Sequence, residues 1–211
     1  MSRVLRYVTH PQVQIDPSVP VPEWGLSELG VARANLFASL DVLKSTRVIV
    51  SSAETKAIET AKVGSGVINV PVQIREQTHE NDRSATGFLE PEEFERVATR
   101  FFESPEDSVR GWERAVDAQT RISREAAQII KDNPDGDLLM VGHGGVGTLL
   151  YCQLASLEIS REHDQPAGGG NIFSYDLTRK AIRHSWMSIE DLSLAAGETS
   201  PGRCPKKPQE N

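Results

Sequence analysis

Cysteine is scarce in this chain, whose 211 residues include only Cys152 and Cys204. Two cysteines cannot form a disulfide framework, and we interpret both as free thiols of a reducing compartment. The N-terminal residues lack the apolar region of a signal peptide, and no apolar run is long enough to span a bilayer. These absences favour a cytoplasmic location and argue against binding to a membrane.

Positive charge is also in deficit, since 23 basic side chains face 30 acidic ones and the formal net charge is -7. Such a chain is poorly suited to non-specific binding of nucleic acid or of an anionic membrane surface. Its length and its ordinary share of apolar residues allow one domain with a full core. We expect a single domain over residues 1–194. A disordered tail rich in proline, glycine, lysine and glutamate should follow over residues 195–211.

Short apolar runs alternate with segments of helical periodicity along the chain. The pattern predicts strands over residues 4–10, 47–52, 70–75, 138–143, 171–177 and 181–187. It predicts helices over 26–40, 53–63, 91–103, 112–131 and 145–157. This order indicates an α/β three-layer sandwich, in which a mostly parallel sheet is covered by helices on both faces. The last two strands should form a hairpin at an antiparallel edge.

Two histidines stand at the ends of two of these apolar runs. His10 closes the first run and is followed by Pro11, while His143 closes the run over 138–142 and is followed by Gly144 and Gly145. Ligands of open α/β sheets bind outside the carboxyl ends of the strands. We therefore expect both imidazoles to face one pocket at that edge.

Other polar residues are predicted near the same edge. Lys56 lies in the first turn after the second strand and could reach an anion, although a solvated surface lysine is the simpler alternative. Glu80, in the polar loop over 77–90, could act as a general acid if burial raises its pKa, and Glu76 is a rival for that role. The helix that begins near Gly144 offers free N–H groups to an anion.

The order of these motifs resembles that of the histidine phosphatase superfamily, which has the phosphoglycerate mutase-like fold. The resemblance covers residues 3–188. It rests on Val-Thr-His at 8–10, Leu-Ser-x-x-Gly at 26–30, Ser-Ser-x-x-x-Lys-Ala-x-x-Thr-Ala at 51–61, the loop carboxylate, and Gly-His-Gly-Gly at 142–145. The resemblance implies that His10 is the phosphorylated nucleophile and His143 its partner. It also implies that Glu80 protonates the leaving group and that neither a metal nor another cofactor is needed.

The chain departs from the family pattern at three positions. The family's Arg-His-Gly is Thr9-His10-Pro11 here, its second arginine is Lys56, and an asparagine often found six residues after the nucleophile is Asp16. Lysine cannot copy the two-point contact of arginine with phosphate, and threonine offers one hydroxyl. Asp16 would repel a phosphate unless its side chain points away.

The resemblance implies a phosphomonoester hydrolase or phosphoryl transferase that acts through a phosphohistidine at His10. The expected phosphate-binding residues are Thr9, Lys56, Arg83 and Gly144, with Arg83 as a source of the missing guanidinium. The expected partner is phosphate or a phosphorylated small molecule. Two alternatives stay open. One is a phosphate- or anion-binding module with weak or no catalysis. The other is a metal hydrolase using His10, His79, Glu80 and His143, whose spacing matches no tight metal motif.

Overall fold

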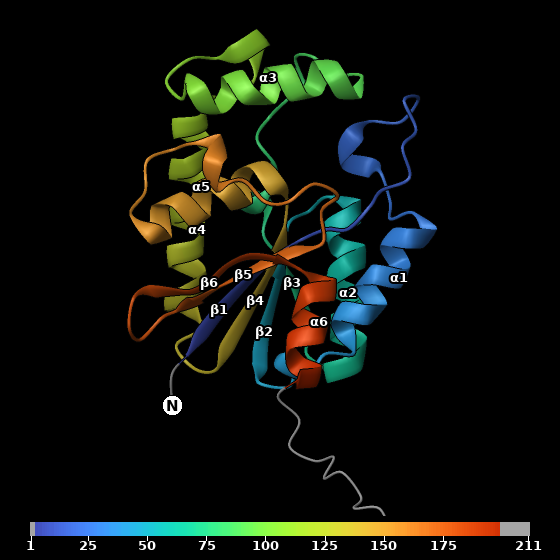
Figure 1. Ribbon diagram of the computed structural model, residues 1–211, viewed down its shortest axis with the longest axis vertical. Helices are drawn as coiled ribbons and strands as arrows, with labels where there is room; N and C mark the ends of the chain where they lie inside the picture. The colour runs from blue at the N-terminus through green and yellow to red at the C-terminus, as the bar shows by residue number, and fades with distance from the viewer. Residues whose placement is uncertain (1–2, 199–211) are drawn as a thin grey trace, which may run out of the picture.

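A computed structural model describes residues 3–198 and contains one six-stranded sheet with the order β3-β2-β4-β1-β5-β6 (Figure 1). The strands are β1 (Val4–Thr9), β2 (Thr46–Ser51), β3 (Val72–Ile74), β4 (Asp137–Gly142), β5 (Asn171–Asp176) and β6 (Ala181–Ser188). The helices are α1 (Glu28–Ala38), α2 (Thr55–Ile68), α3 (Pro91–Glu103), α4 (Ala115–Asp132), α5 (Gly144–Ala155) and α6 (Ile189–Glu198).

The mixed sheet confirms the predicted fold class. Strands β3, β2, β4 and β1 pair in parallel, and β5 and β6 add an antiparallel edge beside β1. Strands β1, β4 and β5 are buried along their whole length, as expected of apolar strands covered on both faces.

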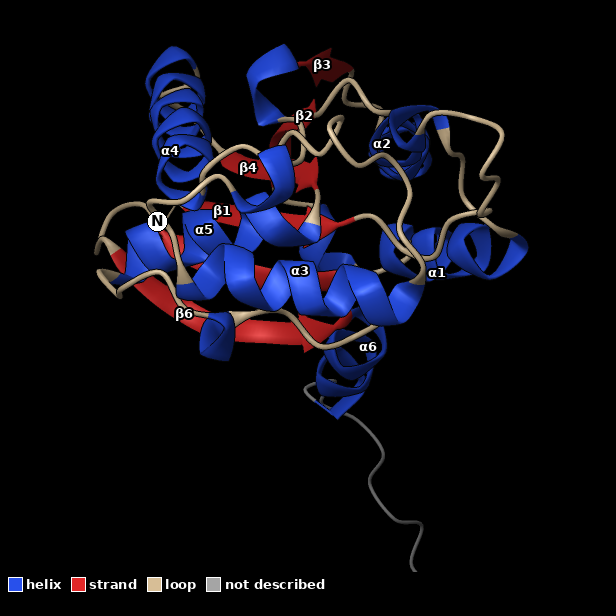
Figure 2. Ribbon diagram, turned by 90° about the horizontal axis from the view of Figure 1, so that it is seen from above, coloured by secondary structure: helices blue, strands red, loops and turns tan. Residues whose placement is uncertain are grey.

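Side chains alternate between two cores, one on each face of the sheet. Along β4, Leu138 and Met140 join the core beneath α3, α4 and α5, whereas Leu139 and Val141 join the core beneath α1, α2 and α6. Figure 1 shows α4 and α5 on one face and α1, α2 and α6 on the other. In the view from above, α3 lies across the upper edge, where β1 and β4 end (Figure 2).

Every predicted strand and helix is present, and the boundaries agree within three residues except at the end of α2. Ser27 caps α1 as expected, because its hydroxyl accepts the N–H of Gly30 at 3.1 Å. Helix α2 runs to Ile68 rather than to residue 63, and β3 is shorter than predicted. Helix α6 was not predicted, although the Ser188 hydroxyl accepts the N–H of Asp191 at its start and so provides a capping signal that the sequence contains.

Helix α6 also changes the predicted tail. Its first residue, Ile189, is fully buried in the core beneath α1 and α2, and the helix continues to Glu198. Residues 195–198 are therefore helical, and the rest of the expected tail, with Cys204, lies outside the described residues. Cys152 is a buried free thiol in α5. None of the helices described over residues 3–198 is long and apolar enough to cross a bilayer.

Candidate active site

His10 and His143 lie against each other at the carboxyl edge of the sheet. Strands β1 and β4 are parallel neighbours with Thr9 opposite Gly142, so the residues that follow them are brought together. The centroids of the two rings are 5.3 Å apart, with an angle of 67° between the planes. The expectation that both histidines reach the same edge is therefore confirmed by the geometry.

The ring of His10 is held in one tautomer. Its Nδ1 lies 2.8 Å from the carbonyl oxygen of Pro11, which can only accept a hydrogen bond, so Nδ1 carries the proton. The lone pair of Nε2 is then uncommitted. Burial, with a smaller contribution from His143, lowers the pKa of His10 to about 3. At neutral pH the ring is a neutral imidazole with a free nitrogen, which suits a nucleophile or a base.

His143 lies deeper than expected. It has no exposed surface, and its Nε2 lies 2.7 Å from Ser52 Oγ and 3.3 Å from Glu54 Oε1. Burial lowers the pKa of His143 below its ordinary value. His10 borders two of the three cavities near this edge, whereas His143 borders none of them. Of the two histidines, only His10 lines a cavity, and His143 packs behind it, so the expectation of one pocket shared by both imidazoles is not met.

Lys56 is buried rather than solvated, but its charge is paired. Its Nζ donates to Glu54 Oε2 at 2.5 Å and to the carbonyl oxygen of Val21 at 2.8 Å. Burial raises the pKa of Glu54, but His143, Lys56 and a backbone N–H lower it more, to about 2. Sequence reasoning did not single out Glu54, because a glutamate before a helix is usually solvated.

Glu80 caps helix α5. Its Oε2 accepts the N–H of Gly145 at 3.1 Å, and its Oε1 accepts the N–H of Val146 at 2.9 Å. Burial raises the pKa of Glu80, but Arg83, His143 and the Val146 N–H lower it more, so the resting group is a carboxylate. The condition set for a general acid, a net rise of the Glu80 pKa, is therefore not met in the resting protein, because Arg83, His143 and the N–H groups at the start of α5 outweigh the effect of burial. Gly144 is the first residue of α5, and its N–H has no hydrogen-bond acceptor within the helix.

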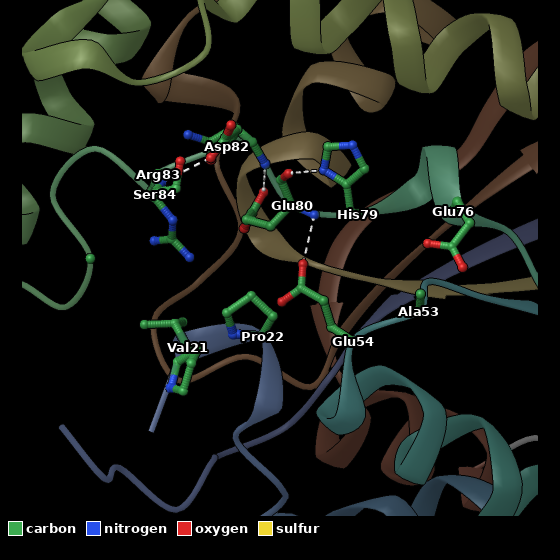
Figure 3. A pocket seen from close by; sticks show the side chains of 13 residues that line it. Val21, Pro22, Ala53, Glu54, Glu76, His79, Glu80, Asp82, Arg83 and Ser84 are labelled. Atoms are coloured by element: carbon green, nitrogen blue, oxygen red, sulfur yellow. Dashed lines mark hydrogen bonds between the residues drawn. The ribbon is translucent and has the colours of Figure 1, made fainter. Parts of the chain in front are cut away.

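Glu76 is less well placed than Glu80. Its side chain is exposed, and in Figure 3 it lies apart from Glu80 and Arg83.

A side chain of α4 holds the backbone around Glu80 in place. Arg121 donates to the carbonyl oxygens of Gln77, His79 and Glu80, and it forms an ion pair with Glu113 at 2.8 Å.

Arg83 lies between the three cavities and is the residue that borders all of them. Its guanidinium carbon is 5.1 Å from the ring centroid of Phe94 and 5.6 Å from that of Trp112. Figure 3 shows the side chain extending toward Val21 and Pro22. This position is compatible with the expected role of Arg83 as a substitute for a family arginine.

Thr9 and Asp16 do not face the cavities. Thr9 is buried, and its hydroxyl donates to Gln165 Oε1 at 2.7 Å and accepts the N–H of Asn171 at 3.0 Å. The structure therefore gives no support to Thr9 as a phosphate ligand. Asp16 bonds to the N–H and hydroxyl of Ser18 in its own loop, and these bonds lower its pKa. The repulsion considered for Asp16 does not arise.

Asn81 is a site residue that sequence reasoning missed. It is 6% exposed, borders the two larger cavities, and has an Nδ2 with no partner among the described residues. Nδ1 of His143 is likewise buried and unpartnered in residues 3–198. Buried donors are normally satisfied, so the Asn81 amide, which borders two cavities, points to a ligand, whereas His143 borders none of the three. An asparagine in a polar loop carries no sequence signal for such a role.

The largest of the three cavities, of about 710 Å³, is bordered by His10, Glu80, Asn81, Arg83 and Gly144. A second cavity, of about 590 Å³, is bordered by Glu54, Glu80, Asn81 and Arg83 (Figure 3). Within residues 3–198, no three histidine, cysteine, aspartate or glutamate side chains are grouped so that they could hold a metal ion. The metal-hydrolase alternative gains no support from this geometry.

Two solved structures show the similarity of fold. A mycobacterial glucosyl-3-phosphoglycerate phosphatase with inorganic phosphate has a TM-score of 0.70 at 21% identity, with 88% of this chain and 94% of that chain covered. An Entamoeba histolytica phosphoserine phosphatase with 3-phosphoglyceric acid has a TM-score of 0.71 at 17% identity, with 90% and 99% covered. No curated protein matches the sequence.

The family assignment comes from the sequence itself. The model of the histidine phosphatase superfamily (branch 1) matches residues 14–186. The match begins after His10, so the altered Thr9-His10-Pro11 segment lies outside it. It nevertheless includes Lys56, Glu80 and His143 and most of the sheet. The chain therefore belongs to branch 1 of the histidine phosphatase superfamily.

Proposed function

We propose that the protein hydrolyses a phosphomonoester, or transfers its phosphoryl group, through a phosphohistidine on Nε2 of His10. The observation that carries this proposal is the hydrogen bond from His10 Nδ1 to Pro11, which leaves a neutral Nε2 free beside the largest cavity. The same cavity is bordered by Glu80, Asn81 and Gly144, so a carboxylate and two donors share its wall with His10.

In the first step, the lone pair of His10 Nε2 attacks phosphorus, and the bond from phosphorus to the leaving oxygen breaks. Glu80 gives a proton to that oxygen. Because the resting Glu80 is a carboxylate, the proton arrives with the substrate, whose negative charge raises the pKa of Glu80. In the second step, Glu80 takes a proton from water, the water oxygen attacks phosphorus, and the bond to Nε2 breaks.

The phosphate oxygens need donors in place of the missing arginines. We assign this role to the Asn81 amide, the Arg83 guanidinium and the Gly144 N–H, which border the cavity. His143 packs against the ring of His10 and borders none of the three cavities, so we assign it to holding the His10 ring rather than to contact with a phosphate oxygen. Lys56 retains one donor beyond its bonds to Glu54 and Val21.

A phosphate- or anion-binding module without turnover is the second candidate. The observation that favours it is the loss of free positive charge, because Thr9 is neutral and turned away and Lys56 is paired with Glu54. Loss of one preorganised donor to a developing charge costs about 2.7–4 kcal/mol, roughly 10²–10³ in rate. Two such losses leave little catalysis unless Asn81 and Arg83 replace the missing contacts.

Trapping of the intermediate separates the two candidates. Wild-type protein is mixed with p-nitrophenyl phosphate and quenched in alkali, and the peptide that contains His10 is analysed for a phosphoryl adduct. We expect the adduct and slow release of nitrophenol in wild type, and neither in His10→Ala. His184→Ala, on the edge strand β6, is the matched control. Activity that survives His10→Ala contradicts the proposal, and phosphate binding without adduct or turnover favours the binding module.

A further inference from the structure

A third cavity, of about 270 Å³, borders His10 and is mainly apolar. Its apolar lining includes Val13, Trp24, Phe88, Leu89, Pro91 and Phe94. These side chains come from the loop after β1, from the segment that leads into α3, and from the first turn of α3 itself. The cavity therefore lies between His10 and an apolar surface made by two segments far apart in the sequence.

The aromatic wall of this cavity is held in place. The rings of Trp24 and Phe88 have centroids 5.7 Å apart. The indole N–H of Trp24 is occupied, since it donates to the carbonyl oxygens of Asp16 and Val19 at 2.9 Å each. The ring thus offers only apolar surface to the cavity. The Lys56 ammonium holds the same loop through the carbonyl oxygen of Val21.

The charged groups around this cavity do not suit an acidic ligand. Lys56 is paired with Glu54, and Arg83 lies over the ring of Phe94. Glu95 adds a carboxylate at the wall and is paired with Arg161. Because the Arg83 guanidinium is assigned to the phosphate group, a carboxylate placed in this cavity would lose its hydration without gaining a cation of its own, which is costly.

We propose that this cavity binds the alcohol part of the substrate, so that the protein acts on phosphate esters of aromatic or other apolar alcohols. The inference rests on the proposed function and names its substrate class. An apolar cavity of about 150 Å³ holds benzene. The larger volume here accommodates a substituted ring or two fused rings. Phosphate esters of small hydroxy acids are disfavoured, because their carboxylate would lie against apolar rings and Glu95.

The test compares esters whose leaving groups are all primary alcohols, so that their intrinsic reactivity is similar. The substrates are benzyl phosphate, naphthylmethyl phosphate, 3-phosphoglycerate and phosphoserine. We expect kcat/KM to be at least about tenfold higher for the two aromatic esters than for the two acidic ones. Turnover with a preference for 3-phosphoglycerate or phosphoserine overturns the inference and leaves the proposed function intact.

Variants of Phe88 connect the preference to this cavity. Phe88→Asn should lower kcat/KM for benzyl phosphate about tenfold and change that for 3-phosphoglycerate little, whereas Phe88→Leu should retain most of the activity. Inhibition by inorganic phosphate should be unchanged in both variants. Leu157→Asn, at a leucine that is 41% exposed, is the control for an apolar-to-amide change elsewhere. An equal loss on both substrates in Phe88→Asn overturns the assignment.

If none of the esters is turned over, the proposed function fails. The cavity can still be tested with two phosphonates that cannot be hydrolysed. Benzylphosphonate should bind more tightly than methylphosphonate to wild type by calorimetry, and this difference should disappear in Phe88→Asn. Equal binding of the two phosphonates by wild type overturns the inference on its own terms.

Discussion

The phenolic oxygen of Tyr7 lies 3.0 Å from both the backbone nitrogen and the backbone oxygen of His143. It accepts the N–H and donates to the carbonyl, so one side chain from β1 fixes the end of β4. A side chain at Gly142 or Gly147 would collide with Tyr7. Glycines near His143 thus make room for a residue of the protein itself, in addition to any ligand.

The first prediction concerns this contact. Tyr7→Phe keeps the ring but leaves the buried N–H of His143 without an acceptor, which costs about 1–3 kcal/mol, whereas the His143 carbonyl keeps its bond from the N–H of Gly147. We expect a clear drop in the free energy of unfolding, measured by urea denaturation. Tyr151→Phe is the control, since the Tyr151 hydroxyl has no hydrogen-bond partner in residues 3–198. Equal stability of the two variants would contradict the role given to Tyr7.

The second prediction concerns the missing arginines. Thr9 is 1% exposed and its hydroxyl has two partners, so Thr9→Arg buries a guanidinium with no space for it. We expect loss of stability and no gain in hydrolysis of p-nitrophenyl phosphate. Arg83→Ala should lower turnover by roughly 10²–10³, and Arg83→Lys should recover only part of it. A higher rate in Thr9→Arg would show that the gap at that position is empty.

The third prediction concerns the dependence of stability on pH. The pKa of His10 is about 3 when folded and 6.5 in its ordinary environment, so between these values the unfolded chain binds the extra proton. The stabilising contribution is complete above pH 6.5 and is lost as pH falls, by about 1.4 kcal/mol per unit. Urea denaturation between pH 6.5 and 4.5 should show at least this slope, because the lowered pKa of His143 acts in the same direction, and His10→Gln should reduce it. Below pH 4.5, Glu54 adds a loss of the same sign.

The fourth prediction concerns Gly169, which lies against His10. Its φ is +65°, and a Cβ there would lie 2.5 Å from the carbonyl oxygen of His10. Gly169→Ala should displace the His10 backbone and lower both stability and phosphoryl transfer. Gly66→Ala is the matched control in α2, where a Cβ meets nothing within 4 Å. That substitution should leave activity unchanged and stabilise the helix by about 0.5–1 kcal/mol.

The fifth prediction concerns Asn81. Asn81→Asp keeps the shape of the side chain but replaces the unpartnered donor with a negative charge. Affinity for inorganic phosphate, measured by calorimetry, should fall by about tenfold or more, because a charge-assisted contact becomes a repulsion. Asn133→Asp, whose side chain caps the end of α4, serves as a control at a site remote from phosphate. Unchanged affinity in Asn81→Asp would remove Asn81 from the phosphate site.

The sequence by itself determined the order of the strands and helices and the edge at which His10 and His143 meet. Apolar β-branched runs fix where strands form, and the proline and glycines after them fix where they end. Parallel strands carry the residues that follow them to one edge of the sheet, so the sequence alone was enough to place the two histidines at the same edge. The Ser27 cap of α1 depends only on neighbouring residues, as these signals do, and it could likewise be predicted from the sequence.

Only the tertiary structure decided the depth and charge of each site residue. His143 lies behind His10, Lys56 is paired with Glu54, and Glu80 is a carboxylate at the start of α5. Contacts such as Glu80 with Val146 join residues 66 positions apart. Burial and Coulomb interactions at these contacts depend on how separate segments pack, and a linear pattern carries no record of that packing.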